Sequence, residues 1–225
     1  MSKTCVINFA NNRAWYMKGQ VRLKQSFLAH GYDDDFLLAN DEKDWGSPPH
    51  TTMPYAFKSY GIQKAIKMGY DRIFWCDSAI YLYNENSLSR IKKQLDEFGF
   101  AIAINGWSTG QWCSDAALPL LGITREESFA IPHPMANVMC FDLHNKTTLE
   151  FLKRYHVHAQ DGSFRGSWKN KNHEVSKDPR VLGHRHDQTA AGVIAWRLGM
   201  KFLINWTSYD PKNTRPEIVF LTHPA

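Results

Sequence analysis

Apolar runs and amphipathic stretches alternate along most of this chain. Runs rich in β-branched and apolar residues predict strands, and they lie at residues 4–10, 36–39, 71–82, 100–105, 136–143 and 201–206. Apolar positions at helical spacing predict helices, at residues 20–30, 55–68, 87–97, 146–156 and 187–198. Alternating strands and helices are typical of an α/β fold, with one mostly parallel sheet and helices on both of its faces.

Three stretches interrupt this alternation. Residues 41–54 contain three prolines, which predicts a loop that cannot join a sheet interior. Residues 106–133 look irregular, with a short helix around 116–121, and residues 160–185 predict a long polar loop or flap. The sequence contains no internal repeat and no linker, so we expect its 225 residues to form a single domain.

The composition is that of a globular protein, with 43% hydrophobic and 22% charged residues. The net charge of +5 suggests an anionic ligand but is too evenly spread for a nucleic-acid-binding arm. No apolar run approaches the roughly 18–20 residues that span a bilayer, and the first residues predict a strand and not a signal peptide. Four widely spaced cysteines without a CxxC pair indicate buried thiols in a reducing compartment, so we expect a cytoplasmic protein.

Asp77 follows the strongest strand signal of the chain, provided that this strand ends at Cys76. Ligands of open α/β sheets bind at the carboxyl ends of the strands. A carboxylate buried at that place needs a partner, and a divalent metal ion is a natural one. The alternative is structural, with the Asp77 side chain capping a turn.

Three segments in order carry a family resemblance: PYAFKSYGIQKAIKMGYDRIFWCDSA, then ANVMCFDLHN, then HRHDQTAAGVIAWRLGM. Together they resemble the GT-A nucleotide-sugar glycosyltransferases, and the resemblance extends from about residue 4 to residue 206. It implies a single GT-A-like, Rossmann-like catalytic domain over residues 1–225. Residues 1–105 would form its nucleotide-binding half and residues 106–225 its acceptor-binding half.

The resemblance also implies an activity. Such enzymes move a sugar, here expected to be a hexose, from a nucleotide-diphosphate donor such as a UDP- or GDP-sugar to an acceptor hydroxyl. The acceptor would be a carbohydrate or a glycoconjugate.

The Asp-x-Asp motif of this family is altered here to Asp77-Ser78-Ala79, without the second carboxylate. In the family these carboxylates hold Mn²⁺ or Mg²⁺ against the donor diphosphate, where the ion stabilises the charge of the leaving group. The resemblance implies Asp77 as a metal ligand and His223, near the C-terminus, as another. One carboxylate can be enough, because such ions keep several waters and use substrate phosphates as ligands.

The resemblance places donor-binding residues after the first strand, on the helix at 55–68 and around Asp77. These expected donor residues are Ala10, Asn11, Arg13, Tyr16, Lys58, Cys76 and Ser78. Tyr16 or Trp15 would stack on the base, and Lys58 would reach the diphosphate as a point charge. An ordinary loop and a solvated lysine are the alternatives for these two regions.

Two further carboxylates, Asp187 and Asp115, are expected beside Asp77 as catalytic residues facing the sugar or the acceptor. For Asp187 the alternative is a helix cap. The expected acceptor-side residues are Trp107, Trp112, His186 and Gln188, because tryptophan faces suit the C–H surfaces of sugars. Core packing is the alternative for each tryptophan. Arg180 and Arg185 could meet a phosphate or a sugar.

Two other functions stay open. A metal-dependent phosphoester hydrolase or nucleotidyltransferase would use Asp77 together with His184, His186 and Asp187. A non-catalytic carbohydrate-binding protein would explain the aromatic content of 13% and the missing second carboxylate.

Overall fold

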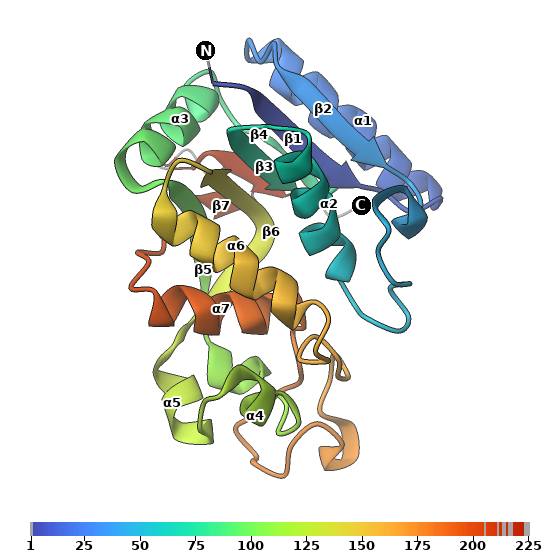
Figure 1. The fold of residues 1–225 in the computed structure, drawn as a ribbon, viewed down its shortest axis with the longest axis vertical. Helices are drawn as coiled ribbons and strands as arrows, with labels where there is room; N and C mark the ends of the chain where they lie inside the picture. Colours follow the sequence, from blue (N-terminus) through green and yellow to red (C-terminus); the bar gives the residue numbers. More distant parts are fainter. Residues whose placement is uncertain (1, 205, 211, 213–214, 216–217, 223–225) are drawn as a thin grey trace.

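A five-stranded central sheet with strand order β2-β1-β3-β6-β5 organises the molecule (Figure 1). The computed structural model describes residues 2–204, 206–210, 212, 215 and 218–222. The five strands are β1 (Thr4–Phe9), β2 (Asp35–Ala39), β3 (Arg72–Cys76), β5 (Phe100–Ser108) and β6 (Pro132–Asp142). β1 pairs in parallel with β2 and β3, whereas β6 runs antiparallel to both β3 and β5. Four strands therefore point the same way, which confirms the mostly parallel sheet.

Helices cover both faces of this sheet, as predicted. The longer ones are α1 (Ala14–Ala29), α2 (Ala56–Lys67), α3 (Ser87–Phe98), α6 (Lys146–His158) and α7 (Asp187–Arg197). The short ones are η1 (Glu42–Trp45), η2 (Thr109–Trp112), α4 (Ala117–Leu121), α5 (Arg125–Ala130) and η3 (Lys171–His173). A second small sheet joins β4 (Ile80–Leu82), β8 (Phe220–Thr222) and β7 (Thr207–Ser208) in the order β4-β8-β7.

Two hydrophobic cores lie on opposite faces of the central sheet, because successive strand residues point to opposite sides. On β3, Ile73 and Trp75 join the core beneath α2, α6 and α7, whereas Phe74 and Cys76 join the core beneath α1 and α3. Figure 1 shows α6 and α7 side by side over the first of these cores. The site described below lies at the carboxyl end of β3, the strand that contributes side chains to both cores.

Several sequence-based boundaries were wrong. The predicted strand at 71–82 is two strands, because a turn at Asp77 separates β3 from β4, with Ile80 N donating to Asp77 O at 2.9 Å. The described residues of the predicted strand at 201–206 (201–204 and 206) belong to no named strand, and Leu203 among them makes an isolated bridge to Ala103. Helix α1 begins at Ala14 and not at residue 20, and α5 was not predicted.

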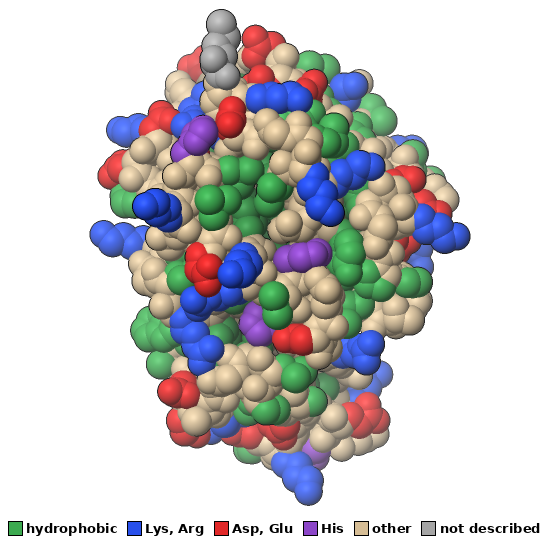
Figure 2. All heavy atoms as spheres, viewed as in Figure 1, with side chains coloured by type: hydrophobic (Ala, Val, Ile, Leu, Met, Phe, Trp, Pro, Cys, Tyr) green, Lys and Arg blue, Asp and Glu red, His purple; other side chains and the backbone are tan. Residues whose placement is uncertain are grey.

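All four cysteines are buried and free, as expected. Burial raises the pKa of the Cys5 and Cys113 thiols to about 12, so these groups are inert core side chains. On the face shown in Figure 2, basic and acidic side chains are interspersed and do not form one basic patch. No helix of the described residues is long and apolar enough to cross a membrane.

Candidate active site

Asp77 stands at the carboxyl end of β3, where its backbone forms the turn and its side chain faces a pocket. The Asp77 N–H donates to Asn137 O on β6 at 2.8 Å, which ends the β3–β6 ladder. The carboxylate does not cap the turn; its Oδ1 accepts from Trp75 Nε1 at 2.8 Å. One third of the side chain is exposed (33%), so this acid is available to a ligand.

Lys58 joins Asp77 to Asp187. Its Nζ lies 3.3 Å from Asp77 Oδ1 and 3.1 Å from Asp187 Oδ2, and it donates to Ala136 O at 2.7 Å. The lysine side chain is 3% exposed, so the solvated lysine considered from the sequence is wrong. Tyr155 OH also donates to Asp187 Oδ2, at 3.3 Å. Helices α2 and α7 and strand β3 thus meet at one ion-paired cluster, which we call the Lys58 triad (Lys58, Asp77 and Asp187).

The electrostatics of the Lys58 triad keep the lysine charged. Burial opposes its charge, but the attraction of Asp187 and Asp77 outweighs burial and raises the pKa of Lys58 well above its usual value. Burial also raises the pKa of Asp77 and of Asp187, an effect that Lys58 offsets in part. With all three groups ionised the triad carries one net negative charge, which suits a ligand that brings hydroxyl donors or a cation.

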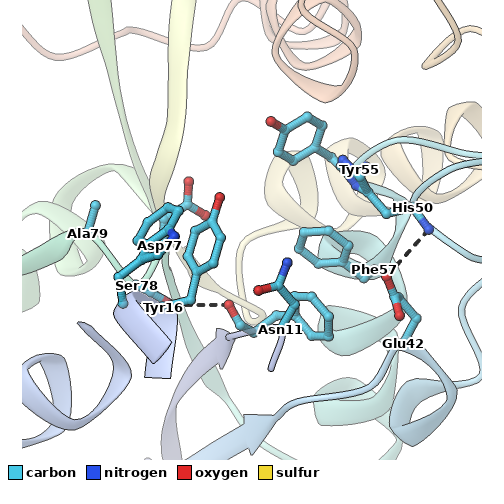
Figure 3. A pocket seen from close by; sticks show the side chains of 11 residues that line it. Asn11, Tyr16, Glu42, His50, Tyr55, Phe57, Asp77, Ser78 and Ala79 are labelled. Carbon is cyan, nitrogen blue, oxygen red and sulfur yellow. Dashed lines mark hydrogen bonds between the residues drawn. The ribbon is translucent and has the colours of Figure 1, made fainter. Parts of the chain in front are cut away.

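An aromatic cavity of about 310 Å³ opens on one side of Asp77 (Figure 3). The residues lining this aromatic pocket are Phe9, Asn11, Trp15, Tyr16, Glu42, His50, Tyr55, Phe57, Asp77, Ser78 and Ala79. In Figure 3 Tyr16 lies beside Asp77, and Tyr55, His50 and Phe57 lie across the cavity from them. Flat aromatic faces in a concave pocket suit a planar heterocycle.

A smaller polar cavity of about 180 Å³ adjoins it. The residues lining this polar pocket are Tyr55, Lys58, Asp77, Asn105, Met135, Asn137, Trp168, Arg185, Asp187, Gln188 and Tyr209. Tyr55 and Asp77 line both cavities, so the two pockets meet there. Amide and carboxylate groups of this kind suit a ligand rich in hydroxyls.

The expected donor residues divide into two sets. Asn11, Tyr16 and Ser78 line the aromatic pocket, and Lys58 lines the polar one. Ala10, Arg13 and Cys76 line neither pocket.

The three outlying residues have structural surroundings. Cys76 is fully buried in the core, so its side chain cannot contact a donor. Ala10 is buried as well, and its backbone N–H donates to Ala39 O at 3.0 Å. Arg13 is exposed and precedes the first residue of α1.

The expected acceptor residues are only partly together. Gln188 lines the polar pocket and donates to Pro134 O at 3.2 Å. His186 is buried and lines neither pocket, with Nδ1 2.8 Å from Phe164 O. Trp112 is 9% exposed, and Trp107, which is 47% exposed, meets its edge with ring centroids 5.8 Å apart.

The backbone of His186 is strained. Its φ of 50° and ψ of −116° lie in a region that residues other than glycine rarely occupy. This conformation directly precedes Asp187, the first residue of α7. Strain of this kind often accompanies functional sites, where the surrounding structure holds a side chain in place.

Asp115 does not join Asp77 and Asp187. It pairs with Arg125 at 2.5 Å, accepts from Ser176 Oγ at 2.8 Å and lines neither pocket. Burial is the largest single effect on Asp115 and raises its pKa, but the Arg125 guanidinium and the Ser176 hydroxyl together outweigh burial and hold the pKa below its usual value. We therefore leave Asp115 out of the proposed site. His223 lies outside the described residues.

The structure adds residues that the sequence did not single out. Tyr55, His50 and Phe57 come from the proline-rich loop and the start of α2. Asn105 and Asn137 come from β5 and β6. The segment containing Asn137 was noticed, but only the antiparallel register of β6 brings this residue opposite Asp77.

Two oxygens of the site fit a divalent ion. Asp77 Oδ1 is engaged by Trp75 and Lys58, and within the described part of the chain Oδ2 has no hydrogen bond. Asn137 Oδ1 is buried and has no hydrogen-bond partner among the described residues. No group of three or more His, Cys, Asp or Glu side chains gathers for a metal in that same part of the chain. The donor set thus fits an ion that takes its other ligands from substrate phosphates and water.

Solved structures resemble the whole chain. A crystal structure of a glycosyltransferase involved in the glycosylation of the major capsid of PBCV-1 matches with a TM-score of 0.52 and 14% identity, covering 98% of this chain and 94% of that one. Mouse xyloside xylosyltransferase 1, in its apo form, matches with a TM-score of 0.51 and 12% identity, covering 92% and 87%. No family model and no curated protein matches the sequence. At these identities the likeness establishes the fold.

Proposed function

We propose that this chain, which has a GT-A-like glycosyltransferase fold, transfers a sugar from a nucleotide-diphosphate donor to an acceptor hydroxyl. The observation that carries the proposal is the position of the Lys58 triad where an aromatic and a polar pocket meet. A nucleotide sugar has the same division: a flat base at one end, a hydroxyl-rich ring at the other and an anionic link between them.

The two pockets assign the parts of the donor. The base and ribose occupy the aromatic pocket, where Tyr16 and Phe57 offer ring faces and Asn11 offers an amide. The diphosphate passes Tyr55 and Asp77, which line both pockets. The hexose enters the polar pocket, where Asp187, Asn105 and Gln188 accept and donate hydrogen bonds.

Each member of the Lys58 triad has a distinct role in this proposal. Lys58 is a positioning residue. Its ammonium group has three oxygen partners, Asp77, Asp187 and Ala136 O, so no N–H is left to donate to a phosphate. Asp187, fixed by Lys58 and Tyr155, orients the transferred sugar. Asp77 and Asn137 would hold Mn²⁺ or Mg²⁺, which as a Lewis acid would stabilise the negative charge of the leaving diphosphate.

The rival functions have less support. A hydrolase built on His184 and His186 needs one free ring nitrogen on each histidine. His184 offers none, because its Nε2 lies 2.9 Å from Ser163 O and its Nδ1 accepts from Ser114 N at 3.2 Å. A protein that only binds sugars would leave the donor intact.

Thermal unfolding with a panel of UDP- and GDP-sugars, with and without Mn²⁺, tests the proposal. We expect one donor to raise the melting temperature, since a ligand that binds only the native state stabilises it. Asp77→Asn should abolish transfer to an acceptor while the protein stays folded, and Asp115→Asn is the matched control that should retain transfer. Full transfer by a folded Asp77→Asn variant, or no response to any donor, contradicts the proposed function.

A further inference from the structure

Arg185 is a guanidinium clamped between two tryptophan rings at the wall of the polar pocket. Its Cζ lies 3.9 Å from the ring centroid of Trp112 and 3.8 Å from that of Trp168. Its backbone N–H donates to Trp112 O at 3.1 Å, which fixes the residue two positions before Asp187. A guanidinium held flat in this way has lost its rotational freedom before any ligand arrives.

No anion of the described part of the chain neutralises Arg185. None of its nitrogens lies within 4.0 Å of a described carboxylate, and its buried Nε has no hydrogen-bond partner among the described residues. Arg180, five residues earlier in the same long loop, instead pairs with Glu126 and Asp178. Nothing in the sequence distinguishes these two arginines, but in the structure Arg180 has carboxylate partners and Arg185 has none among the described residues.

The two acids of the polar pocket do not form ion pairs with Arg185. Asp77 and Asp187 line the same cavity but pair with Lys58. Burial between the tryptophans lowers the pKa of Arg185, although a guanidinium stays charged at any physiological pH. A partly buried cation without a partner is costly, and a ligand oxyanion that forms paired N–H···O bonds relieves that cost.

The place of Arg185 indicates which oxyanion it binds. Arg185 lines the polar pocket and does not line the aromatic pocket, whereas the proposed path of the diphosphate follows Tyr55 and Asp77, which line both. Arg185 shares the polar pocket with the proposed position of the hexose, so an anionic group carried by that sugar would lie beside the guanidinium. Exposed ring surface of Trp168, which is 42% exposed, is available to the C–H face of that sugar.

We propose that Arg185 binds the carboxylate of an acidic sugar, so that one of the two substrates of this enzyme is a uronic acid. The inference rests on the proposed glycosyl transfer and names its substrate class. The carboxylate belongs either to the transferred sugar or to the acceptor, and the chemistry of recognition is the same in both.

Ligand-observed NMR with the 225-residue chain tests this. Glucuronate and galacturonate are compared with glucose and galactose, each with the nucleoside diphosphate that the chain binds. We expect the uronates to bind about tenfold more tightly than the neutral sugars, which is the gain in affinity from one charge-assisted pair of hydrogen bonds. Arg185→Gln should remove that preference and Arg185→Lys should keep part of it. Arg154→Gln, which changes a half-exposed arginine of α6 that pairs with Glu150, is the matched control.

Each outcome is decisive. Equal binding of acidic and neutral sugars by the unaltered chain overturns the inference without any variant, and so does an Arg185→Gln variant that keeps the preference. Failure to bind any nucleoside diphosphate would instead overturn the proposed function. A preference for UDP-glucuronate over UDP-glucose assigns the carboxylate to the transferred sugar. A preference seen only for free uronate in the presence of UDP-glucose assigns it to the acceptor.

Discussion

At the scale of single residues, Lys58 is the positive charge that pairs with both acids of the Lys58 triad. Its ammonium is enclosed by two carboxylates and a carbonyl, so each acid depends on it for neutralisation. Losing one partner of a buried ion pair costs more than the pair contributes to stability, because a desolvated charge remains.

We expect Lys58→Met, a substitution of similar length, to lower the free energy of unfolding by about 3–5 kcal/mol and to abolish transfer. Adding Asp187→Asn should recover much of the stability, because the second variant removes one unpaired charge. Urea unfolding of both single variants and the double variant measures this coupling. Additive losses would show that Lys58 and Asp187 do not interact.

At the scale of the elements, one helix packs directly on the turn that follows β3. Gly19 of α1 faces the backbone of Ser78, and an added Cβ would collide with the Ser78 carbonyl group and lie 3.2 Å from its Cβ. The absence of a side chain at Gly19 thus permits α1 to reach the Asp77-Ser78-Ala79 turn, which lines the aromatic pocket.

Gly19→Ala should therefore destabilise the protein by about 1–3 kcal/mol, although alanine is the better helix former. The same change should weaken nucleotide binding by displacing the turn. Chemical unfolding and nucleotide titration measure the two effects. Gln25→Ala, an exposed change on the same helix, should stay within about 0.5 kcal/mol. A Gly19→Ala protein as stable as this control would mean that the contact carries no strain.

The elements also show what the sequence could predict. The end of the apolar run at Cys76 placed Asp77 at a strand end, and the Asp-Gln pair marked the start of α7. Both predictions depend on patterns among neighbouring residues, which can be read directly from the sequence. The aromatic lining and the opposition of Asn137 to Asp77 depend on strand order and register between distant segments. The same holds for Arg185, whose two tryptophans come from η2 and from the long loop.

At the scale of the whole molecule, buried histidines make stability depend on pH. Burial, with repulsion from nearby Arg185 and other histidines, lowers the pKa of His133 and of His184 to about 3 and that of His186 to about 4. The unfolded chain binds these protons near pH 6.5, whereas the native chain does not. The free energy of unfolding contributed by these groups therefore falls as the pH falls from about 6.5 toward 4.

His133→Leu isolates one of these protons. Both ring nitrogens of His133 lack hydrogen-bond partners within the described part of the chain, so an apolar side chain should be tolerated at pH 8. Between pH 8 and pH 5 the variant should lose about 2 kcal/mol less stability than the unaltered protein. Urea unfolding across this range gives the slope. Parallel curves for the two proteins would show that His133 is neutral in both states or charged in both.

The enclosed ammonium of Lys58 also has a consequence for biosynthesis. Its partners are separated along the chain: Asp77 follows within 20 residues, but Ala136 and Asp187 are made much later. A nascent chain that ends before α7 can dock α2 on the sheet only by enclosing a cation whose neutralisation is incomplete. We therefore expect a ribosome-bound fragment of residues 1–105 to stay protease-sensitive. Release of α7 from the exit tunnel would then complete the neutralisation of Lys58.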